Sequence, residues 1–350
     1  MEDQSTKIRN PHAGEHKGRS FVSAQQVADL AGVSRSAVSR TFTEGASVSS
    51  STRQKVLNAA NVLGYHVNHL ARSLIQEDSR IVCVIGAEIA TPYQARMLEA
   101  LSRCLQSIGR IPMLINTAGE SASSEAALRQ ALNYRASATI VLSGAPPASL
   151  IQTCVDSGQQ VFLINRDDHL DRSQTLWVDN ALAAAEAFHM FKRAGCRTLA
   201  VVSSTAGTPS LVARERGFEE AAHQAGLKVT VARCGPTSYA SGFMAGQLLL
   251  SGSHRPDAAF CVTDLLACGF IDAARFEFEM RIPRDLCIIG FDDIDEAGWS
   301  AYALTTFRQP VEEMARHIMM RIQDAGAKTA SLTTARFQAK PIWRRTVRPR

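Results

Sequence analysis

The sequence lacks the features of a membrane-spanning, secreted or metal-centred protein. Its 350 residues contain no run of about 18 apolar residues, which excludes a spanning helix. Residues 1–19 lack the apolar core of a secretory signal, so we expect a cytoplasmic protein. The eight cysteines are scattered, without a CxxC motif or a His-paired ligand spacing. They are expected to be buried thiols, and no metal or other cofactor is expected.

Signatures of common enzymes are also missing. We find no GxGxxG after the first expected strand, and no Walker, GxSxG or HExxH motif. The acidic pairs Asp167-Asp168 and Asp292-Asp293, with His169 beside the first, leave acid/base chemistry open as an alternative. Strand-end acids in α/β proteins more often hydrogen-bond a polar ligand, so the sequence favours binding over catalysis.

Positive charge is concentrated at the two ends of the chain. The composition, 45% hydrophobic and 20% charged with a net charge of +5, is that of a globular protein of two or three units. Residues 1–77 carry nine Lys/Arg and six Asp/Glu, and residues 336–350 carry six Lys/Arg and no acid, which leaves −4 between them. Such ends could meet a polyanion, although solvated basic faces are also common.

The stretch from Ser23 to Phe42 predicts two short helices joined by a tight turn. Ser23 and Gln26 form a capping box at the start of the first helix, and Gly32 supplies its left-handed exit. Ser34 can cap the second helix. The free face of that helix is cationic and carries no acid: Arg35, Ser36, Ser39 and Arg40. This layout predicts a DNA-reading helix-turn-helix, with an ordinary helical hairpin at a domain edge as the alternative.

A third helix and a short helical segment are expected next. Ser49 caps the third helix, whose apolar residues recur at helical spacing until Gly64 ends it. Three helices around one small core make a headpiece. Residues 65–74 follow, where Asn68 can cap about two turns of helix that are too short to persist alone. This segment needs a partner or a surface, unless it is a plain linker.

From Arg80 onward, apolar strands alternate with amphipathic helices. The first set places strands at 81–85, 111–115, 138–142 and 160–164, with helices near 92–108, 123–134 and 147–157. The second set places strands at 199–203, 229–231, 258–262 and 286–289, with helices near 180–194, 210–225, 239–250 and 264–274. Repeated βα alternation predicts two doubly wound parallel sheets that enclose a cleft, with their boundary near 177–180 and a crossing back at 305–309.

Taken together, these stretches resemble the lactose-repressor family of bacterial transcription regulators from about Phe21 to the C-terminus. The family's VAxxAGVSxxxVSR pattern is matched at Val27, Ala28, Ala31, Gly32, Val33, Ser34, Val38, Ser39 and Arg40. Its VSxxTRxKV signature is matched at Val48, Ser49, Thr52, Arg53, Lys55 and Val56, and its hinge at Asn68 and Ala71 to Leu74. Further matches are residues 178–180, Arg214 with Gly217-Phe218, residues 289–293 and residues 304–306.

The resemblance implies an all-α helix-turn-helix headpiece with a hinge helix, followed by an α/β two-lobed sensor domain like periplasmic binding proteins. The implied boundaries are a mobile arm at 1–19, the headpiece at 20–66, the hinge helix and linker at 67–78, and an effector-binding and dimerisation domain at 79–350. Within that domain we expect an N-lobe of about 79–178 and 305–332, and a C-lobe of about 179–304 and 333–350.

For function, the resemblance implies a homodimeric regulator, in most cases a repressor, that binds a near-palindromic operator on double-stranded DNA in the nucleoid. The residues implied to contact bases are Arg35, Ser36 and Arg40, where arginine can donate two hydrogen bonds to a guanine. Those implied to contact phosphates are Ser34, Ser39, Thr52, Arg53 and Lys55. The implied minor-groove hinge is Asn68, Ala71, Arg72 and Leu74, with Leu74 wedged into a base step.

The resemblance also implies a small-molecule effector, often a sugar, between the lobes. The implied contacts are Arg214, Asn165, Asp292 and Thr263, followed by Tyr93 and Thr237. As an alternative, Arg214 could be a helix-surface charge paired with Glu215 or Glu219.

The sequence departs from the family pattern at Val67, where a proline is common, and at Ile75, where a basic residue often stands. It also departs at Thr237, where relatives stack an aromatic ring on a sugar, and at residues 86–88, where a Pro-Asp pair is usual. A solute-binding protein and a cytoplasmic enzyme on a doubly wound fold remain the rival interpretations.

Overall fold

The protein consists of two compact units, Met1–Glu77 and Asp78–Arg350. The computed structural model describes residues 21–43, 45–67, 79–117, 121–142, 147–165, 173–324 and 334–349. The expected arm at 1–19 and the expected hinge helix lie outside the described residues. Within the described part, no helix is both long enough and apolar enough to cross a membrane.

The first unit is a three-helix headpiece. Its helices are α1 (Ala24–Ala31), α2 (Arg35–Thr41) and α3 (Ser50–Leu63), and they begin and end where the sequence predicted. One small core holds them together: Val27, Ala28, Val38, Val56, Ala59 and Ala60. Alanines at three of these positions let the helix backbones approach closely, so a few residues suffice to close the core.

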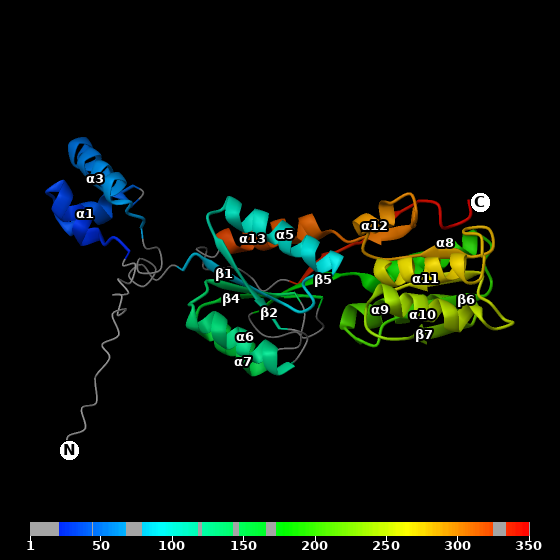
Figure 1. Ribbon diagram of the computed structural model, residues 1–350. Helices are drawn as coiled ribbons and strands as arrows, with labels where there is room; N and C mark the ends of the chain where they lie inside the picture. The colour runs from blue at the N-terminus through cyan, green and yellow to red at the C-terminus, as the bar shows by residue number, and fades with distance from the viewer. Residues whose placement is uncertain are drawn as a thin grey trace, which may run out of the picture. The chain divides into compact units, whose positions relative to one another are not determined.

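The N-terminal lobe of the second unit is built on a six-stranded sheet in the order β11-β5-β4-β3-β1-β2. All its strand pairs are parallel. The strands are β1 (Ile81–Gly86), β2 (Ile111–Asn116), β3 (Ala138–Val141), β4 (Gln160–Ile164), β5 (Gln174–Val178) and β11 (Ala335–Phe337). Helix α5 (Pro92–Ser107) packs with α13 (Val311–Gln323), and α6 (Ser121–Asn133) packs with α7 (Ala148–Asp156). These two pairs cover opposite faces of the sheet (Figure 1).

The C-terminal lobe repeats this plan on a four-stranded parallel sheet in the order β7-β6-β8-β9. Its strands are β6 (Leu199–Ser203), β7 (Val229–Arg233), β8 (Ala258–Cys261) and β9 (Cys287–Ile289). Helix α8 (Asn180–Arg193) packs on α9 (Pro209–Gln224), and α10 (Tyr239–Leu250) packs on α11 (Asp264–Phe276). Right-handed crossovers in this strand order place the two helix pairs on opposite faces. The fold class predicted from the sequence is therefore confirmed.

The chain crosses between the lobes three times. It crosses after β5, again between the short helix α12 (Asp295–Gly298) and α13, and again after β11. The last two crossings pair as antiparallel strands, β10 (Thr306–Arg308) with β12 (Lys340–Ile342). One expectation needs correction here: the C-lobe was expected to resume at about 333, but β11 still pairs with β5 of the N-lobe sheet. The alternation of strands and helices does not tell which strand a final strand pairs with, so the sequence alone could not place β11.

Two glycines allow α10 and α11 to touch. A Cβ added at Gly269 would lie 2.0 Å from the carbonyl oxygen of Tyr239, and one added at Gly242 would lie 2.1 Å from that of Leu266. The two backbones are therefore in direct contact, and any side chain at these positions would force the helices apart.

Gly269→Ala should consequently destabilise the second unit. Because the clash involves backbone rather than a flexible side chain, we expect a loss of about 1–3 kcal/mol in the free energy of unfolding, measured by urea denaturation. The matched control is Gly252→Ala, where a Cβ meets nothing within 4 Å. Equal stabilities for the two variants would show that α10 and α11 are not in close contact.

Candidate nucleic-acid interface and ligand site

The first two helices of the headpiece are held by local capping. The backbone N–H of Ser23 donates to Gln26 Oε1 at 2.8 Å, and the backbone N–H of Gln26 donates to Ser23 Oγ at 3.3 Å. This is the predicted capping box. Gly32 then ends α1 with a φ of 65°. Because both ends of α1 are fixed, the turn into α2 is short and the direction of α2 is determined.

Helix α2 exposes a cationic, acid-free face. The side chain of Ser34 caps it by accepting from the backbone N–H of Ala37 at 3.2 Å. Val38 is fully buried against the headpiece core. Arg35, Ser36, Ser39 and Arg40 are all exposed, as the sequence predicted. The face can thus donate hydrogen bonds from two guanidinium groups and two hydroxyls, a set suited to base edges and phosphates.

The candidate phosphate contacts on α3 are not all equally free. Ser49 caps α3 by accepting from the backbone N–H of Thr52 at 3.2 Å, and Lys55 is exposed. Arg53 instead donates from Nη1 to the carbonyl oxygen of Thr41 at 2.9 Å and so fastens α3 to the end of α2. The assignment of Arg53 as a phosphate contact stays a prediction, and its side chain also has this structural role. Asn68, Ala71, Arg72 and Leu74 lie outside the described residues.

In the second unit, a buried arginine organises the edge of the C-lobe. The side chain of Arg214, on α9, is only 3% exposed. Its Nε donates to Asn180 Oδ1 at 2.8 Å, and its Nη1 donates to the Val262 carbonyl at 2.8 Å and to Asp292 Oδ1 at 3.3 Å. Its guanidinium also lies 3.6 Å from the centre of the Phe291 ring. The alternative of a surface charge paired with Glu215 or Glu219 is therefore wrong.

Asp292 balances the charge of Arg214 within the protein. Its carboxylate also accepts from Gln309 Nε2 at 2.6 Å, so a residue just after β10 contacts the same group. Burial raises the pKa of Asp292, while Arg214 and Gln309 oppose that rise by stabilising the charged form. Burial likewise lowers the pKa of Arg214, and Asp292 opposes that change. The result is a buried ion pair that is hydrogen-bonded to Asn180, at the first crossing between the lobes, and to Gln309, at the second.

Tyr93 and Asn165 come to the same place from the N-lobe. The electrostatic environment of the Tyr93 hydroxyl includes Asp292 and Arg214, and its burial raises its pKa. The Asn165 side chain is close enough to this hydroxyl to oppose that rise, and its Oδ1 accepts from the Val178 backbone N–H at 3.0 Å. The structure thus brings together four predicted site residues, Arg214, Asp292, Tyr93 and Asn165.

Three buried polar atoms have no hydrogen-bond partner among the described residues: Tyr93 Oη, Gln94 Oε1 and Gln309 Oε1. Tyr93 and Gln94 are neighbours on the first turn of α5, and Gln309 is bound to Asp292. Leaving buried polar atoms unpaired is costly, so the unpaired Tyr93 Oη and Gln309 Oε1 are suited to pair with a ligand. The sequence analysis missed Gln309 and Asn180, which contact Asp292 and Arg214, as site residues.

Thr263 and Thr237 play local structural roles in the described structure. Thr263, 6% exposed, caps α11 by accepting from the Leu266 backbone N–H at 3.4 Å. Thr237 donates from Oγ1 to Ser204 Oγ at 3.1 Å. Their assignment as ligand contacts stays a prediction.

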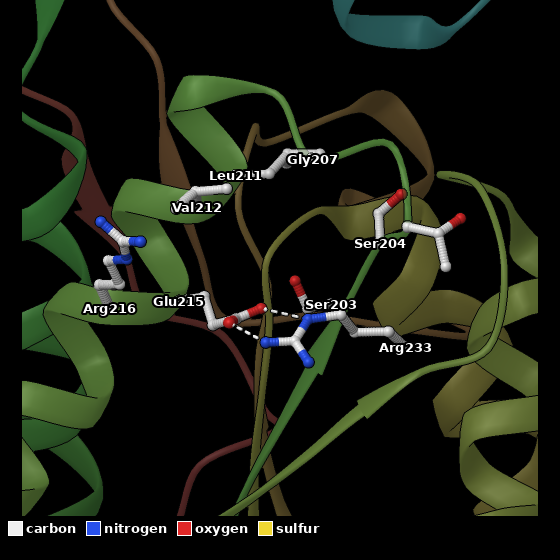
Figure 2. A pocket seen from close by; sticks show the side chains of 9 residues that line it. Ser203, Ser204, Gly207, Leu211, Val212, Glu215, Arg216 and Arg233 are labelled. Atoms are coloured by element: carbon white, nitrogen blue, oxygen red, sulfur yellow. Dashed lines mark hydrogen bonds and ion pairs between the residues drawn. The ribbon is translucent and has the colours of Figure 1, made fainter.

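A cavity of about 280 Å³ lies at the carboxyl end of β6. It is lined by Ser203, Ser204, Thr205, Gly207, Leu211, Val212, Glu215, Arg216 and Arg233. Figure 2 shows Arg233 facing the carboxylate of Glu215 across this cavity, with Arg216 pointing away from the pair. Ser204, which lines this cavity, accepts from Thr237, a predicted site residue.

Two further acids, Asp264 and Asp293, accept hydrogen bonds from the segments that join the lobes. Asp264, fully buried, accepts from Thr306 Oγ1 at 2.6 Å and from the Ile294 backbone N–H at 3.0 Å, and burial raises its pKa to about 7. Asp293 accepts from Arg308 and Arg344, each at 2.6 Å. In the described part of the chain, no cluster of three His, Cys, Asp or Glu residues could hold a metal ion.

A capped helix-turn-helix joined to a two-lobed α/β unit with polar groups at the lobe connections defines a ligand-responsive transcription regulator. Residues 24–68 match the bacterial regulatory proteins of the lacI family, and residues 188–347 match the periplasmic binding protein-like domain. The chain therefore combines a DNA-binding region of the lacI family with a periplasmic binding protein-like domain.

Similar proteins span nearly the same length. The transcriptional regulator DegA of Bacillus subtilis is 28% identical over 295 residues, covering 82% of this chain and 86% of its own. The repressor CytR of Escherichia coli K12 is 25% identical over 311 residues, covering 88% and 91%. A lac repressor dimer bound to operator and an anti-inducer has the same fold, with a TM-score of 0.84 at 20% identity over 93% of this chain and 99% of that one. The chain is therefore a regulator and not an enzyme.

Breaking the buried ion pair from one side should be strongly destabilising. Arg214→Met leaves Asp292 buried without its cation, and we expect a loss of about 3–5 kcal/mol in the free energy of unfolding. Arg214→Met combined with Asp292→Leu removes both charges and should recover part of that loss. A double-mutant cycle by urea denaturation checks this, and additive losses would contradict a direct interaction.

Proposed function

We propose that this protein is a transcriptional repressor that binds a near-palindromic operator as a homodimer and responds to a neutral, hydroxyl-rich metabolite held near Arg214. Two features carry the proposal together: the exposed, acid-free face of α2, and the unpaired oxygens of Tyr93 and Gln309 beside the Arg214–Asp292 ion pair. The first can read DNA, and the second can read a small molecule. Such a protein would be found on the nucleoid.

For DNA, we assign base contacts to Arg35, Ser36 and Arg40. Their side chains are exposed on one short helix, and arginine can make two hydrogen bonds to a guanine in the major groove. We assign phosphate contacts to Ser34, Ser39, Thr52, Arg53 and Lys55, and minor-groove contacts to Asn68, Ala71, Arg72 and Leu74. These groups set register and contribute affinity that depends on salt.

The homodimer follows from the small size of the reading surface. Helix α2 has seven residues, so one headpiece can contact only a few base pairs. Two copies related by a two-fold axis would read two half-sites and multiply the discrimination, which explains a near-palindromic operator. A lac repressor of the same fold was solved as a dimer on operator DNA, which supports this assembly.

For the effector, the charges and the unpaired atoms favour a neutral polyol such as a sugar. Arg214 already has an internal counter-charge in Asp292, so an anionic ligand would have to displace a buried carboxylate. Gln309 Oε1 can only accept, and the Tyr93 hydroxyl can donate or accept. Hydroxyl groups of a ligand satisfy both. Structures of similar fold hold cellobiose and ribose, which agrees with this class.

Base-reading and phosphate-reading residues should separate in a binding experiment. Arg35→Ala and Arg40→Ala should each cost about 1–3 kcal/mol on the operator and relax preference at defined positions, because a base contact is lost. Lys55→Ala should weaken operator and random DNA alike and reduce the salt slope by about one. Operators selected from genomic fragments and fluorescence anisotropy over a range of salt concentrations provide the measurement.

The control for that experiment is Gln54→Ala, at an exposed position on α3 whose side chain donates to Asn58. It should leave operator affinity unchanged. If the Arg35 variant lost affinity equally on operator and random DNA, the assignment of Arg35 as a base contact would be wrong.

Tyr93→Phe should weaken effector binding without lowering the free energy of unfolding of the free protein. Removing a buried hydroxyl that has no hydrogen-bond partner in the described part of the chain should leave the free protein as stable as before, or more stable by up to about 1 kcal/mol. The same change should weaken an effector that pairs with it. Thermal shift against neutral mono- and disaccharides, nucleosides and the corresponding sugar acids and phosphates measures both effects.

Two outcomes decide the assignment of the effector. Stabilisation by neutral sugars or nucleosides that Tyr93→Phe reduces would support it. Stabilisation only by the acids or phosphates, or an unchanged response of the Tyr93→Phe variant, would overturn it. Tyr134→Phe, at an exposed tyrosine on the N-lobe surface, is the matched control.

A further inference from the structure

Asp293 is held from both lobes of the second unit. It lies just after β9 of the C-lobe, and its side chain, 4% exposed, accepts from Arg308 and Arg344 on the segments that cross between the lobes. Its backbone carbonyl accepts from Arg96 Nη1 at 3.0 Å. Arg96 belongs to α5, a helix of the N-lobe, and is 197 positions away in the sequence. A direct hydrogen bond therefore joins the lobes here, in addition to the chain crossings.

Arg96 lies on the same face of α5 as Tyr93. The two residues are three positions apart near the start of the helix, so their side chains are neighbours. The Tyr93 hydroxyl has no hydrogen-bond partner among the described residues, and Asp292 contributes to its electrostatic environment. Arg96 contacts the next residue of the C-lobe, Asp293. The start of α5 thus faces residues 292–293 with a ligand-site residue and a hydrogen-bond donor side by side.

The backbone of residues 292–293 has an unfavourable conformation. The φ angle is 120° at Asp292 and 57° at Asp293, values that residues other than glycine rarely adopt. Such a conformation persists only where the surrounding contacts determine it. The Asp292 carboxylate is held by Arg214 and Gln309, and the Asp293 carbonyl is held by Arg96. Loss of Arg96 therefore removes one of the contacts that keep this segment, and the carboxylate of the ligand site, in place.

We propose that Arg96 is a positioning residue that holds the start of α5 against residues 292–293, and so sets how closely the two lobes approach at the ligand site. The inference rests on the proposed effector site, because it concerns how Tyr93 of the N-lobe is placed relative to Asp292 and Gln309. A small ligand pairs with groups from both sides only when those groups are close together. Arg96 stabilises that arrangement by joining the lobes and not by binding the ligand.

The contact can be removed without breaking the ion pairs of Asp293. Its acceptor is a backbone carbonyl, so the Asp293 carboxylate keeps Arg308 and Arg344 when Arg96 is changed. A carbonyl needs only one N–H donor, so lysine can replace arginine here in part. The hydrogen bond is partly buried and its donor is charged, so we expect its loss to change the ratio of separated to closed lobes about tenfold.

The test measures the separation of the lobes in the full chain without added ligand. Spin labels on unnatural amino acids at two exposed positions, Gln130 of α6 and Gln224 of α9, report the distance between the lobes by pulsed electron resonance. Labelled chains are diluted with unlabelled protein, so that distances within one chain dominate. In Arg96→Met the population at longer distance should rise about tenfold relative to the shorter one. Arg96→Lys should restore most of the shorter distance.

Arg103→Met is the matched control. Arg103 lies on the same helix, but it pairs with Glu312 of α13, within the N-lobe, and should leave the distance unchanged. An unchanged distance distribution in a folded Arg96→Met variant, equal shifts in the Arg96 and Arg103 variants, or no recovery in Arg96→Lys would overturn the proposal. Loss of folding in Arg96→Met would also contradict it, because a contact that only positions the lobes is not needed to fold them.

Ligand binding separates this proposal from that of the effector. Where a neutral sugar binds the unchanged protein, Arg96→Met should weaken its binding by the factor by which the shorter distance loses population, because only that arrangement pairs with the ligand from both sides. Tyr93→Phe should weaken binding at an unchanged distance. Weaker binding in Arg96→Met at an unchanged distance would make Arg96 a ligand contact and overturn its positioning role. If no neutral sugar binds, the effector class is wrong, and the distances still decide the role of Arg96.

Discussion

The buried guanidinium of Arg214 is the constraint on which the second unit depends. A cation that is 3% exposed must be satisfied from within, and its acceptors come from three separate segments of the chain: Asn180, Val262 and Asp292. Asn180 is itself fixed, because its Nδ2 donates to the Val178 carbonyl at 2.9 Å. The desolvation of Arg214 is offset only while all of these groups stay in place, so the charge ties the start of α8, the end of β8 and the segment after β9 to one geometry.

That geometry also makes the crossings between the lobes sensitive to a ligand. Gln309 lies on the second crossing and holds Asp292 through Nε2, while its Oε1 stays unpaired in the described structure. Asp293, one residue further along, holds Arg308 of the second crossing and Arg344 of the third. A ligand can shift an equilibrium only by binding one arrangement better than another. A molecule that pairs with Gln309 favours the arrangement in which Gln309 stays bonded to Asp292. That preference can affect the other chain segments that join the lobes.

How much the sequence predicted depends on how local each signal is. The headpiece helices were predicted to their ends because Ser23, Ser34, Ser49 and the glycines act within a few residues. The alternation of strands and helices likewise predicted both lobes. The neighbours of Arg214 in the sequence could not show that it is buried. Glu215, which could have paired with it, pairs instead with Arg233 of β7, a residue 18 positions away. Gln309 carries no local signal at all, because its importance comes from Asp292, which is 17 residues away. The partner of β11 was missed for the same reason.

The separation of the chain into two units limits how regulation can work. The core of the headpiece is formed by residues between Val22 and Tyr65, and Arg53 fastens α3 to the end of α2 by donating to the Thr41 carbonyl. The shape of α2 is therefore set by its own unit, and a ligand near Arg214 has no direct means of changing which bases Arg35 or Arg40 can reach. If the ligand controls DNA binding, it must do so by altering how two headpieces are presented together, since simultaneous binding at two half-sites gains affinity only when their separation fits. Sequence preference and ligand response are therefore expected to be separable by mutation.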